Sequence, residues 1–482
     1  MLIRQTLAYS PAQILSPLTQ FATAIILTHY LGAAEYGLTM LVFASQELIF
    51  QVCLAWWTTY FLRYAGSHQE AEARARLART ESAVLLGTAM LQVLATMALV
   101  TFGGQTPTLA FLLGACLYVL TRSYVNFLSE RARRDVRILD YTLLQLGAPL
   151  GGLLLTLLLI ATFGASPARI LLDFALVHAV IALIVALRMG ALALPGRPDM
   201  DLLRAALAFG VPISISNLFG WMAAQGIRFV VQFGAGATAL GLLSVGWGLA
   251  GRLATVSAMV VTAAAYPLAV RAMDAGDAEG ARRQLAHNSA LLLGLIAPST
   301  AGVIAITEPF VTLLVASEYR AATIAILPWA LLGAAIRNLR MHGWDQMYLL
   351  FEAPRSMVTM EGLEALVTLI AAALGLYWAG ITGAVIGTTI AALLVAIADY
   401  AYLNRRFGLH APFGFYLKIA LATAVMMLAL YGMPKIGLPI LPTVKGLVLA
   451  ILTGMVTYSL VIGALFFREI RSGLRDWRAR HG

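Results

Sequence analysis

The chain contains fourteen apolar segments, each long enough to cross a lipid bilayer as a helix. A spanning helix needs about 20 predominantly apolar residues, because each residue advances the helix by about 1.5 Å. Hydrophobic residues form 60% of the chain and charged residues only 12%, about half the charged share of soluble proteins. The sequence therefore predicts an all-α polytopic membrane protein with about 14 transmembrane helices. The expected spans are 7–30, 37–62, 81–103, 107–129, 139–163, 167–190, 205–232, 239–266, 285–306, 322–350, 355–378, 381–403, 415–432 and 444–467.

The positions of lysine and arginine indicate how these spans are oriented, because basic residues concentrate in cytoplasmic loops. If the N-terminus is cytoplasmic, the loops on that side, together with Arg4 and Lys418, hold 24 of the 33 basic residues. The opposite loops hold only four. Both termini are therefore expected in the cytoplasm. The net charge of +10 follows from this placement and does not indicate nucleic-acid binding.

The seventh span repeats features of the N-terminus. Leu207–Pro212 parallels Leu7–Pro11, and Gly241 lies 204 residues after Gly37 in a similar turn. Spans 1–6 and 7–12 begin and end on the same side, so we expect two six-helix lobes related by a pseudo-two-fold axis along the membrane normal. Two extra C-terminal helices follow. The predicted parts are an N-lobe (1–190), a cytoplasmic linker (191–204), a C-lobe (205–403), spans 13 and 14 (415–467) and a basic cytoplasmic tail (468–482).

Several ionisable residues lie deep in the expected spans. Each costs at least ~2.5–3.5 kcal/mol at the centre of a bilayer, so each needs a partner or a water-filled cavity. They are Glu47, Arg122, Asp173, His178, Arg228, Arg252, Arg337, Arg340, Asp345, Glu361, Glu364 and Asp399. Three of them, Asp173, Arg228 and Asp399, lie within about two turns of a span end, where an ordinary interfacial position is equally favoured.

Glu47 and Arg252 lie near the middle of equivalent spans. The offset of 204 places Glu47 at position 251, one residue from Arg252. We expect a pair that bridges the lobes and is made and broken as access alternates. The alternatives are a static packing pair, or two charges that each face the cavity alone.

A second predicted pair joins spans 10 and 11. Arg340 and Glu364 lie twelve residues before and after the centre of their turn, so antiparallel helices would bring them to equal depth. This pair leaves Arg337 for the cavity. Arg122 lies at the matching depth of span 4, so both lobes carry an arginine in their cytoplasmic half.

Arginine suits phosphate because its planar guanidinium binds oxygens bidentately and stays charged. The five arginines predicted to bind an anionic head group such as pyrophosphate are Arg122, Arg228, Arg252, Arg337 and Arg340. The candidates for gating or coupling are Glu47, Asp173, His178, Glu364 and Asp399. For His178 a buried core position is the more common alternative to a proton relay.

Catalysis is not expected. A membrane polymerase, ligase or glycosyltransferase generally carries acidic or histidine groups on an outer loop or domain. Here the charged outer cluster is only Glu308, Glu318 and Arg320. Cys53 and Cys116 fall inside apolar segments, so no disulfide, metal or cofactor site is expected.

Two stretches resemble a known family. Leu31–Gly37 (LGAAEYG) resembles the "LG..EYG" turn of bacterial polysaccharide transporters, the Wzx-type polysaccharide or O-antigen flippases of the multidrug/oligosaccharidyl-lipid/polysaccharide exporter superfamily. The seventh span is similar in its Phe-Gly-x-Pro start and its Phe-Gly end. The resemblance covers most of the first twelve spans. One position departs from the family: its Asp-Arg pair late in span 7 is Ile227-Arg228 here.

The resemblance implies a V-shaped transporter whose spans 1, 2, 7 and 8 border the cavity and its lateral gate. It also implies that the protein flips an undecaprenyl-pyrophosphate-linked oligosaccharide from the inner to the outer leaflet of the bacterial inner membrane, for surface polysaccharide assembly. The lipid bilayer and this lipid-linked substrate are the expected partners. A coupling ion (H+ or Na+) and the polysaccharide polymerase machinery are further candidates.

Two alternatives belong to the same superfamily. Fourteen spans match MurJ-type lipid II flippases, although their N-terminal arginine motifs are absent from this sequence. A multidrug exporter with cationic substrates would favour an acidic lining, whereas arginine dominates the candidate lining here.

Overall fold

The structure is a computed structural model that describes residues 2–67, 70–102, 108–191, 196–469 and 471. Every regular element in these ranges is helical, which confirms the predicted all-α class. The helices in the first half are α1 (Leu2–Thr28), α2 (Ala33–Cys53), α3 (Ala55–Tyr64), η1 (Ala65–Ser67), α4 (Ala71–Phe102), α5 (Leu109–Arg134), α6 (Ile138–Thr142), η2 (Leu143–Gly147), α7 (Ala148–Phe163), α8 (Pro167–Met189) and α9 (Met200–Gln225).

The second half continues the same pattern. Its helices are α10 (Ile227–Asp274), α11 (Ala278–Ala305), α12 (Thr307–Leu314), α13 (Ser317–Leu339), η3 (Arg340–Trp344), α14 (Gln346–Leu350), α15 (Pro354–Phe407), α16 (Phe413–Gly432), η4 (Met433–Ile436) and α17 (Val444–Leu465). Residues 192–195 of the predicted linker and 470 and 472–482 of the predicted basic tail lie outside the described residues.

Among the described residues, twelve helices are long and apolar enough to cross a membrane. One of them, α15, contains two predicted spans, because Ala379 and Gly380 leave the helical conformation between them. Helix α1 coincides with the first predicted span. Gly236, with φ +81°, breaks α10 between the predicted seventh and eighth spans. A multi-pass membrane protein with about fourteen spans is therefore confirmed in outline.

The second and tenth predicted spans are interrupted, the second where the sequence carries no glycine or proline signal. The second span divides at Leu54, because the Trp56 indole donates to the Cys53 carbonyl oxygen (2.9 Å) and diverts it from the helix ladder. The tenth span is interrupted by the π-helical turn η3, which contains Gly343 and in which the Asp345 amide donates to the Arg340 carbonyl oxygen (2.9 Å). Such wide turns occur mostly as single insertions and often at functional sites.

The chain forms two compact units. Unit 1 is Met1–Ser244 with Glu364–Leu369, and unit 2 is Val245–Leu363 with Ile370–Gly482. The division after Ser244 differs from the predicted lobe boundary at the 191–204 linker, because α9 packs against α2 and α3 of unit 1. The lobes therefore remain a prediction from the sequence repeat.

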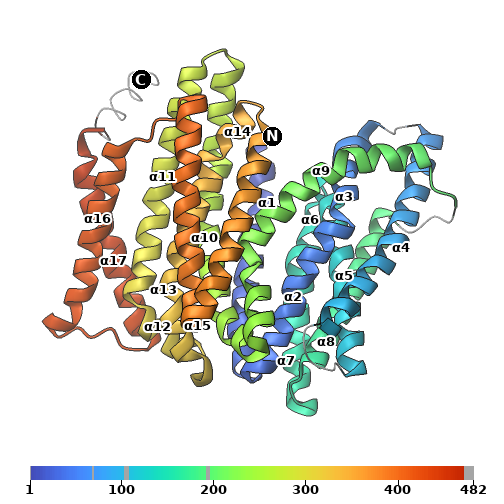
Figure 1. Ribbon diagram of the computed structural model, residues 1–482, viewed down its shortest axis with the longest axis horizontal. Helices are drawn as coiled ribbons and strands as arrows, with labels where there is room; N and C mark the ends of the chain where they lie inside the picture. Colours follow the sequence, from blue (N-terminus) through green and yellow to red (C-terminus); the bar gives the residue numbers. More distant parts are fainter. Residues whose placement is uncertain (1, 68–69, 103–107, 192–195, 470, 472–482) are drawn as a thin grey trace. The chain divides into compact units, whose positions relative to one another are not determined.

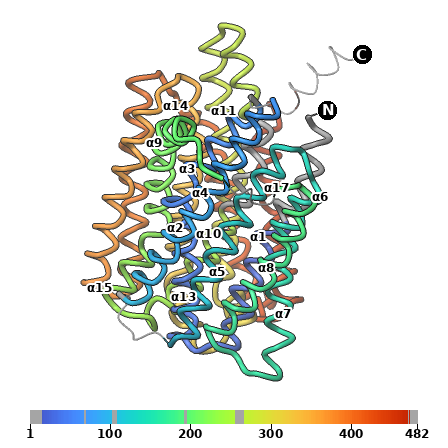
Figure 2. Tube along the Cα trace, turned by 90° about the vertical axis from the view of Figure 1, so that its right-hand side faces the viewer, coloured from blue at the N-terminus to red at the C-terminus, as the bar shows by residue number. Residues whose placement is uncertain are grey.

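Small residues allow close helix packing within unit 1. Helices α5 and α8 run side by side along their lengths (Figure 2). Gly152 of α7 faces the Phe174 ring of α8, where a β-carbon would overlap the ring. Gly210 of α9 lies against the Trp56 carbonyl of α3 in the same way. Small residues at crossings are typical of membrane helices, because apolar lipid provides little hydrophobic drive for association.

Helices α2 and α10 cross at a reciprocal contact that follows the sequence repeat. A β-carbon at Gly37 would overlap the Ala237 carbonyl oxygen, and one at Gly241 would overlap the Ala33 carbonyl oxygen. Gly37 and Ala33 correspond to Gly241 and Ala237 by the same offset of 204. A two-fold axis produces such pairs of contacts, because each contact of a residue i with a residue j is repeated by the equivalent contact of j with i. The crossing thus carries the predicted local two-fold symmetry.

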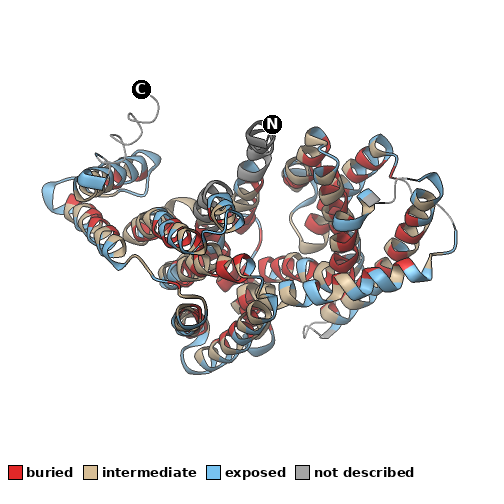
Figure 3. Cartoon of the chain, turned by 90° about the horizontal axis from the view of Figure 1, so that it is seen from above, coloured by how far each residue is buried: buried red, intermediate tan, exposed pale blue. Residues whose placement is uncertain are grey.

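Unit 2 is built around α11 and α15. Helix α11 packs on α13 and α16, and α16 lies beside α17 (Figure 1). The two halves of α15 turn back on one another through Gly375, Gly383 and Gly387, each of which would overlap backbone if it carried a β-carbon. Figure 3 shows that buried residues lie on the sides of helices that face other helices, while the outward sides are exposed.

The reciprocal crossing gives a stability prediction. Gly37→Ala and Gly241→Ala each place a methyl group against backbone, so the helices must separate, at a cost of about 1–3 kcal/mol. Both variants should lower the midpoint of thermal unfolding of the detergent-solubilised protein. Gly87→Ala is the matched control, because nothing lies within 4 Å of its β-carbon position. Equal midpoints for Gly37→Ala and Gly87→Ala would contradict the crossing.

Candidate functional site

A cluster of aromatic rings and one histidine joins three helices of unit 1. Phe43 of α2 stacks on Tyr118 of α5, with ring centroids 4.8 Å apart. His178 of α8 lies 5.7 Å from the Tyr118 ring and 6.0 Å from the Phe174 ring. These rings fill the space where α2, α5 and α8 meet and hold the three helices in register.

His178 is deeply buried in this cluster, with 1% of its surface exposed. Among the described residues, neither of its ring nitrogens has a hydrogen-bond partner. The surroundings are aromatic, so the structure offers the ring no neighbouring acceptor for a proton. The packing agrees with the core alternative, and the coupling role of His178 remains a prediction.

Arg122 borders the same cluster. It lies one turn after Tyr118 on α5, and its charge acts on both Tyr118 and His178. Its Nη1 atom is buried and has no hydrogen-bond partner in the described part of the chain. Buried guanidinium nitrogens normally bind an oxygen, and an unfilled one marks a place for a ligand or water. This residue was predicted to bind an anionic head group.

The carboxylate of Glu47 faces out of α2 beside this cluster. Glu47 is exposed, and the indole of Trp221 on α9 donates to its Oε2 atom at 3.1 Å. The adjacent Gln46 donates to Ser123 of α5 (3.2 Å), which fixes the position of α2 against the Arg122 turn. Glu47 also acts electrostatically on Tyr118, so an acid and an arginine lie on neighbouring helices around one buried tyrosine.

Asp173 has a local partner. The Arg169 guanidinium, one turn earlier on α8, donates to its carboxylate at 3.3 Å and also covers the Phe163 ring at 4.3 Å. Asp173 is 5% exposed, so this pair offsets the cost of its burial. These contacts are those of a side chain that is held in place on its own helix. A role of Asp173 in gating remains a prediction.

Arg228 and Glu364 are both buried in unit 1, with 9% and 2% of their surfaces exposed. Arg228 is the second residue of α10, and Leu369 packs against Gly226 at the α9–α10 junction. The Glu364–Leu369 segment of α15 therefore belongs to the packing of the seventh span. Arg340 belongs to unit 2, so the predicted Arg340–Glu364 pair remains a prediction.

Unit 2 contains its own buried polar cluster. Arg340 in η3 is 2% exposed, and its Nη2 atom lies 3.7 Å from Oδ2 of Asp345. The Tyr348 hydroxyl of α14 donates to Oδ1 of Asp399 on α15 at 2.6 Å, and Asp399 is completely buried. Asp345 and Asp399 both act electrostatically on Tyr348, so both carboxylates lie near the tyrosine.

Arg252 and Arg337 are partly buried in unit 2. Arg252 donates to the Gly248 carbonyl oxygen of its own helix at 3.2 Å, and Arg337 lies one turn before η3 on α13. Glu47 belongs to unit 1 and Arg252 to unit 2, so their predicted pairing remains a prediction. Within the described ranges, no cluster of histidine, cysteine or carboxylate groups could hold a metal ion.

Sequence reasoning missed three aromatic members of these clusters: Tyr118, Trp221 and Tyr348. For Tyr118, a detectable signal was its position one turn before a charged residue in an apolar span. Trp221 and Tyr348 bind carboxylates on other helices, Glu47 and Asp399 respectively, and no local pattern marks such partners.

Solved structures with the same fold are membrane transporters. One is "Lipid II flippase MurJ, inward closed conformation", with a TM-score of 0.71 and 13% identity, covering 96% of this chain and 99% of that one. An inward-facing multidrug resistance MATE family transporter of the MOP superfamily has a TM-score of 0.64 and 15% identity, covering 82% and 94%. At these identities the likeness establishes the fold, here a MurJ/MATE-like transporter fold.

A third structure is a MOP superfamily transporter from Pyrococcus furiosus Vc1, whose description reads "Reverse polarity of binding pocket suggests different function". Its TM-score is 0.52 at 15% identity, covering 84% of this chain and 95% of that one. No curated protein sequence matches the chain. A family model described as "Polysaccharide biosynthesis protein" matches residues 26–324, more than half of the chain, and the chain therefore belongs to this polysaccharide biosynthesis family.

Proposed function

We propose that this protein flips an undecaprenyl-pyrophosphate-linked oligosaccharide from the inner to the outer leaflet of the bacterial inner membrane by alternating access. Both termini would lie in the cytoplasm, and the product would supply surface polysaccharide assembly such as O-antigen or exopolysaccharide. The protein acts as a transporter and not as an enzyme in this proposal. Membership of the polysaccharide biosynthesis family and the transporter fold support this function class.

The observation that carries the choice of substrate is the environment of Arg122. A buried guanidinium nitrogen without a partner among the described residues suits an anionic oxygen, because charge-assisted hydrogen bonds are strong where water is scarce. Arg228, also in unit 1, is a second buried arginine. Buried positive charge favours a pyrophosphate group, whereas it would repel a cationic drug.

Lipid II is the alternative substrate. The fold similarity to a lipid II flippase extends over 96% of this chain. A lipid II flippase would need the same arginines for the same pyrophosphate, so the residues of the lining do not separate the two substrates. The multidrug alternative rests on the MATE-like fold alone.

Deletion of the gene tests the function class in cells. Lipid-linked repeat units should accumulate on the cytoplasmic side, and surface polysaccharide should fall, as measured by lipid extraction and surface staining. Accumulation of lipid II with arrest of cell-wall synthesis would instead support the alternative substrate. Loss of ethidium export with unchanged surface polysaccharide would contradict both lipid-linked proposals.

Arg122 provides a test of the binding role. Arg122→Gln removes the charged donor, and a charge-assisted hydrogen bond contributes roughly 1.5–3 kcal/mol. We therefore expect transport to fall by about ten-fold or more, while Arg122→Lys keeps part of the activity. Arg63→Gln is the control, because it removes one exposed arginine from the end of α3. Full complementation of the deletion strain by Arg122→Gln would rule out this role.

The predicted Glu47–Arg252 pair is tested by charge reversal. Glu47→Arg and Arg252→Glu should each reduce transport, and the double variant should recover part of it if the two side chains pair during the cycle. Complementation of the deletion strain is the measurement. If the double variant transports no better than either single variant, the pairing is wrong.

A further inference from the structure

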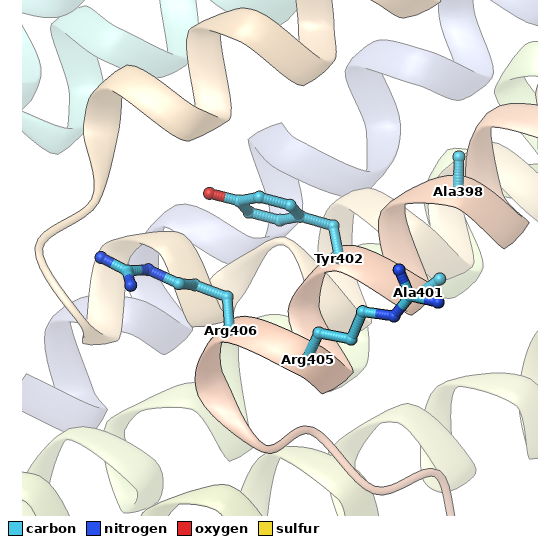
Figure 4. Close-up of a pocket in the computed structure, with 5 residues that line it drawn as sticks. All are labelled: Ala398, Ala401, Tyr402, Arg405 and Arg406. Atoms are coloured by element: carbon cyan, nitrogen blue, oxygen red, sulfur yellow. The ribbon is translucent and has the colours of Figure 1, made fainter.

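A small basic pocket lies at the end of α15 in unit 2, apart from the buried polar cluster. Its volume is about 370 Å³, and it is lined by Ala398, Ala401, Tyr402, Arg405 and Arg406 (Figure 4). Figure 4 shows Tyr402 and Arg406 extending to the same side of the helix, while Arg405 runs toward Ala401. The alanines contribute an apolar wall, and the arginines contribute charge.

The helix end that carries the pocket is held firmly. The Tyr402 hydroxyl shares a hydrogen bond with the Ser356 hydroxyl (2.8 Å), and Asn404 donates to the Leu409 carbonyl oxygen (2.6 Å). The Phe407 carbonyl oxygen accepts from Arg282 (2.7 Å), and the Gly408 amide donates to the Asn404 carbonyl (3.0 Å). These bonds satisfy terminal carbonyl groups that could otherwise attract Arg405 and Arg406.

Arg405 and Arg406 have no hydrogen-bond or ion-pair partner in the described ranges, and both are exposed. Three arginines of unit 1 are instead paired with carboxylates. Arg131 contacts Glu81 at 2.6 Å, and both Arg137 and Arg188 contact Asp140 at 2.7 Å. The pocket lining therefore carries two positive charges that no carboxylate among the described residues offsets.

An apolar stripe leads along α15 to this pocket. Ile390, Leu394 and Ile397 are each more than half exposed, at 52%, 56% and 58%. They are followed at intervals of four residues by Ala401 and Arg405, and side chains three or four residues apart share one face of a helix. The face therefore changes from exposed aliphatic side chains to arginine at the helix end. A lipid with acyl chains and an anionic head has the same order of apolar and charged parts.

We infer that this pocket binds the phosphodiester head group of an anionic glycerophospholipid, whose acyl chains lie along the Ile390–Ile397 stripe. The Arg405 guanidinium, on the same face as the stripe, binds the phosphate oxygens, Arg406 adds positive charge to the helix end, and the alanine wall contacts the glycerol carbons. The placement of this head group in the cytoplasmic leaflet rests on the membrane orientation given in the proposed function. The chemistry of binding does not depend on that orientation. Besides the arginines, the only polar side chain in the lining is Tyr402, whose hydroxyl is already bonded to Ser356, and this favours a phospholipid over the sugar-bearing lipid-linked substrate.

Lipid retention by the full-length protein tests the inference. The protein is placed in nanodiscs of phosphatidylcholine with a minority of phosphatidylglycerol, and native mass spectrometry measures the phosphatidylglycerol that stays bound on release. The double variant Arg405→Gln/Arg406→Gln should retain at least about ten-fold less, since each basic residue near a membrane surface contributes measurably to anionic-lipid binding. Ala401→Trp fills the pocket without removing charge and should also reduce retention.

The matched control is Arg283→Gln/Arg355→Gln, which removes two exposed arginines of unit 2 that do not line the pocket. It should retain phosphatidylglycerol like the unaltered protein. If the control loses phosphatidylglycerol equally, or if Ala401→Trp retains it unchanged, binding in the pocket is wrong and a general attraction to the basic surface explains the retention. Displacement of phosphatidylglycerol by an equal amount of undecaprenyl pyrophosphate would overturn the assignment to a phospholipid. The assay measures no transport, so its failure leaves the flippase proposal standing.

Discussion

Polar groups without hydrogen-bond partners are costly in hydrocarbon, and this cost determines the structure that the whole chain adopts. Backbone amides and carbonyls can be satisfied within a single segment only in a helix, so the apolar segments all become helices. Ionisable side chains also need partners, and in this structure nearby side chains provide them. Asp140 is held between Arg137 and Arg188, Asp399 accepts from Tyr348, and Asp173 accepts from Arg169. Charges inside such a fold are therefore positioned by their partners.

Close packing through small residues is the second requirement. Where helices cross at Gly37 and Gly241, carbonyl oxygens of one helix approach the α-carbons of the other. Approaches of this kind allow weak Cα–H···O contacts and a larger dispersion energy. Because the two glycines correspond by the sequence repeat, duplication of one packing solution explains both. The crossing places α2, which carries Glu47, against the start of the second repeat.

Much of the fold followed from local sequence. Apolar length predicted the helices, and the breaks at Gly236 and Gly380 fall in the predicted gaps between spans 7 and 8 and between spans 11 and 12. The division at Leu54 could not be predicted, because it depends on a tryptophan indole that captures a carbonyl of the same chain. For the candidate site, Arg340 and His178, which the sequence places deep in a span, are buried, whereas Glu47, also placed near the middle of a span, is exposed. Their partners could not be predicted, since rotation of each helix about its axis is set by tertiary packing.

The central claim is that the chain moves a pyrophosphate-linked lipid between leaflets. Its most direct measurement uses proteoliposomes that contain the purified protein and an undecaprenyl-pyrophosphate-linked oligosaccharide in both leaflets. A lectin added outside reports how much of the sugar becomes accessible with time. The account predicts that inner-leaflet sugar reaches the outer surface much faster with the protein than in protein-free liposomes. Identical rates, under imposed H+ and Na+ gradients as well as without them, would contradict it.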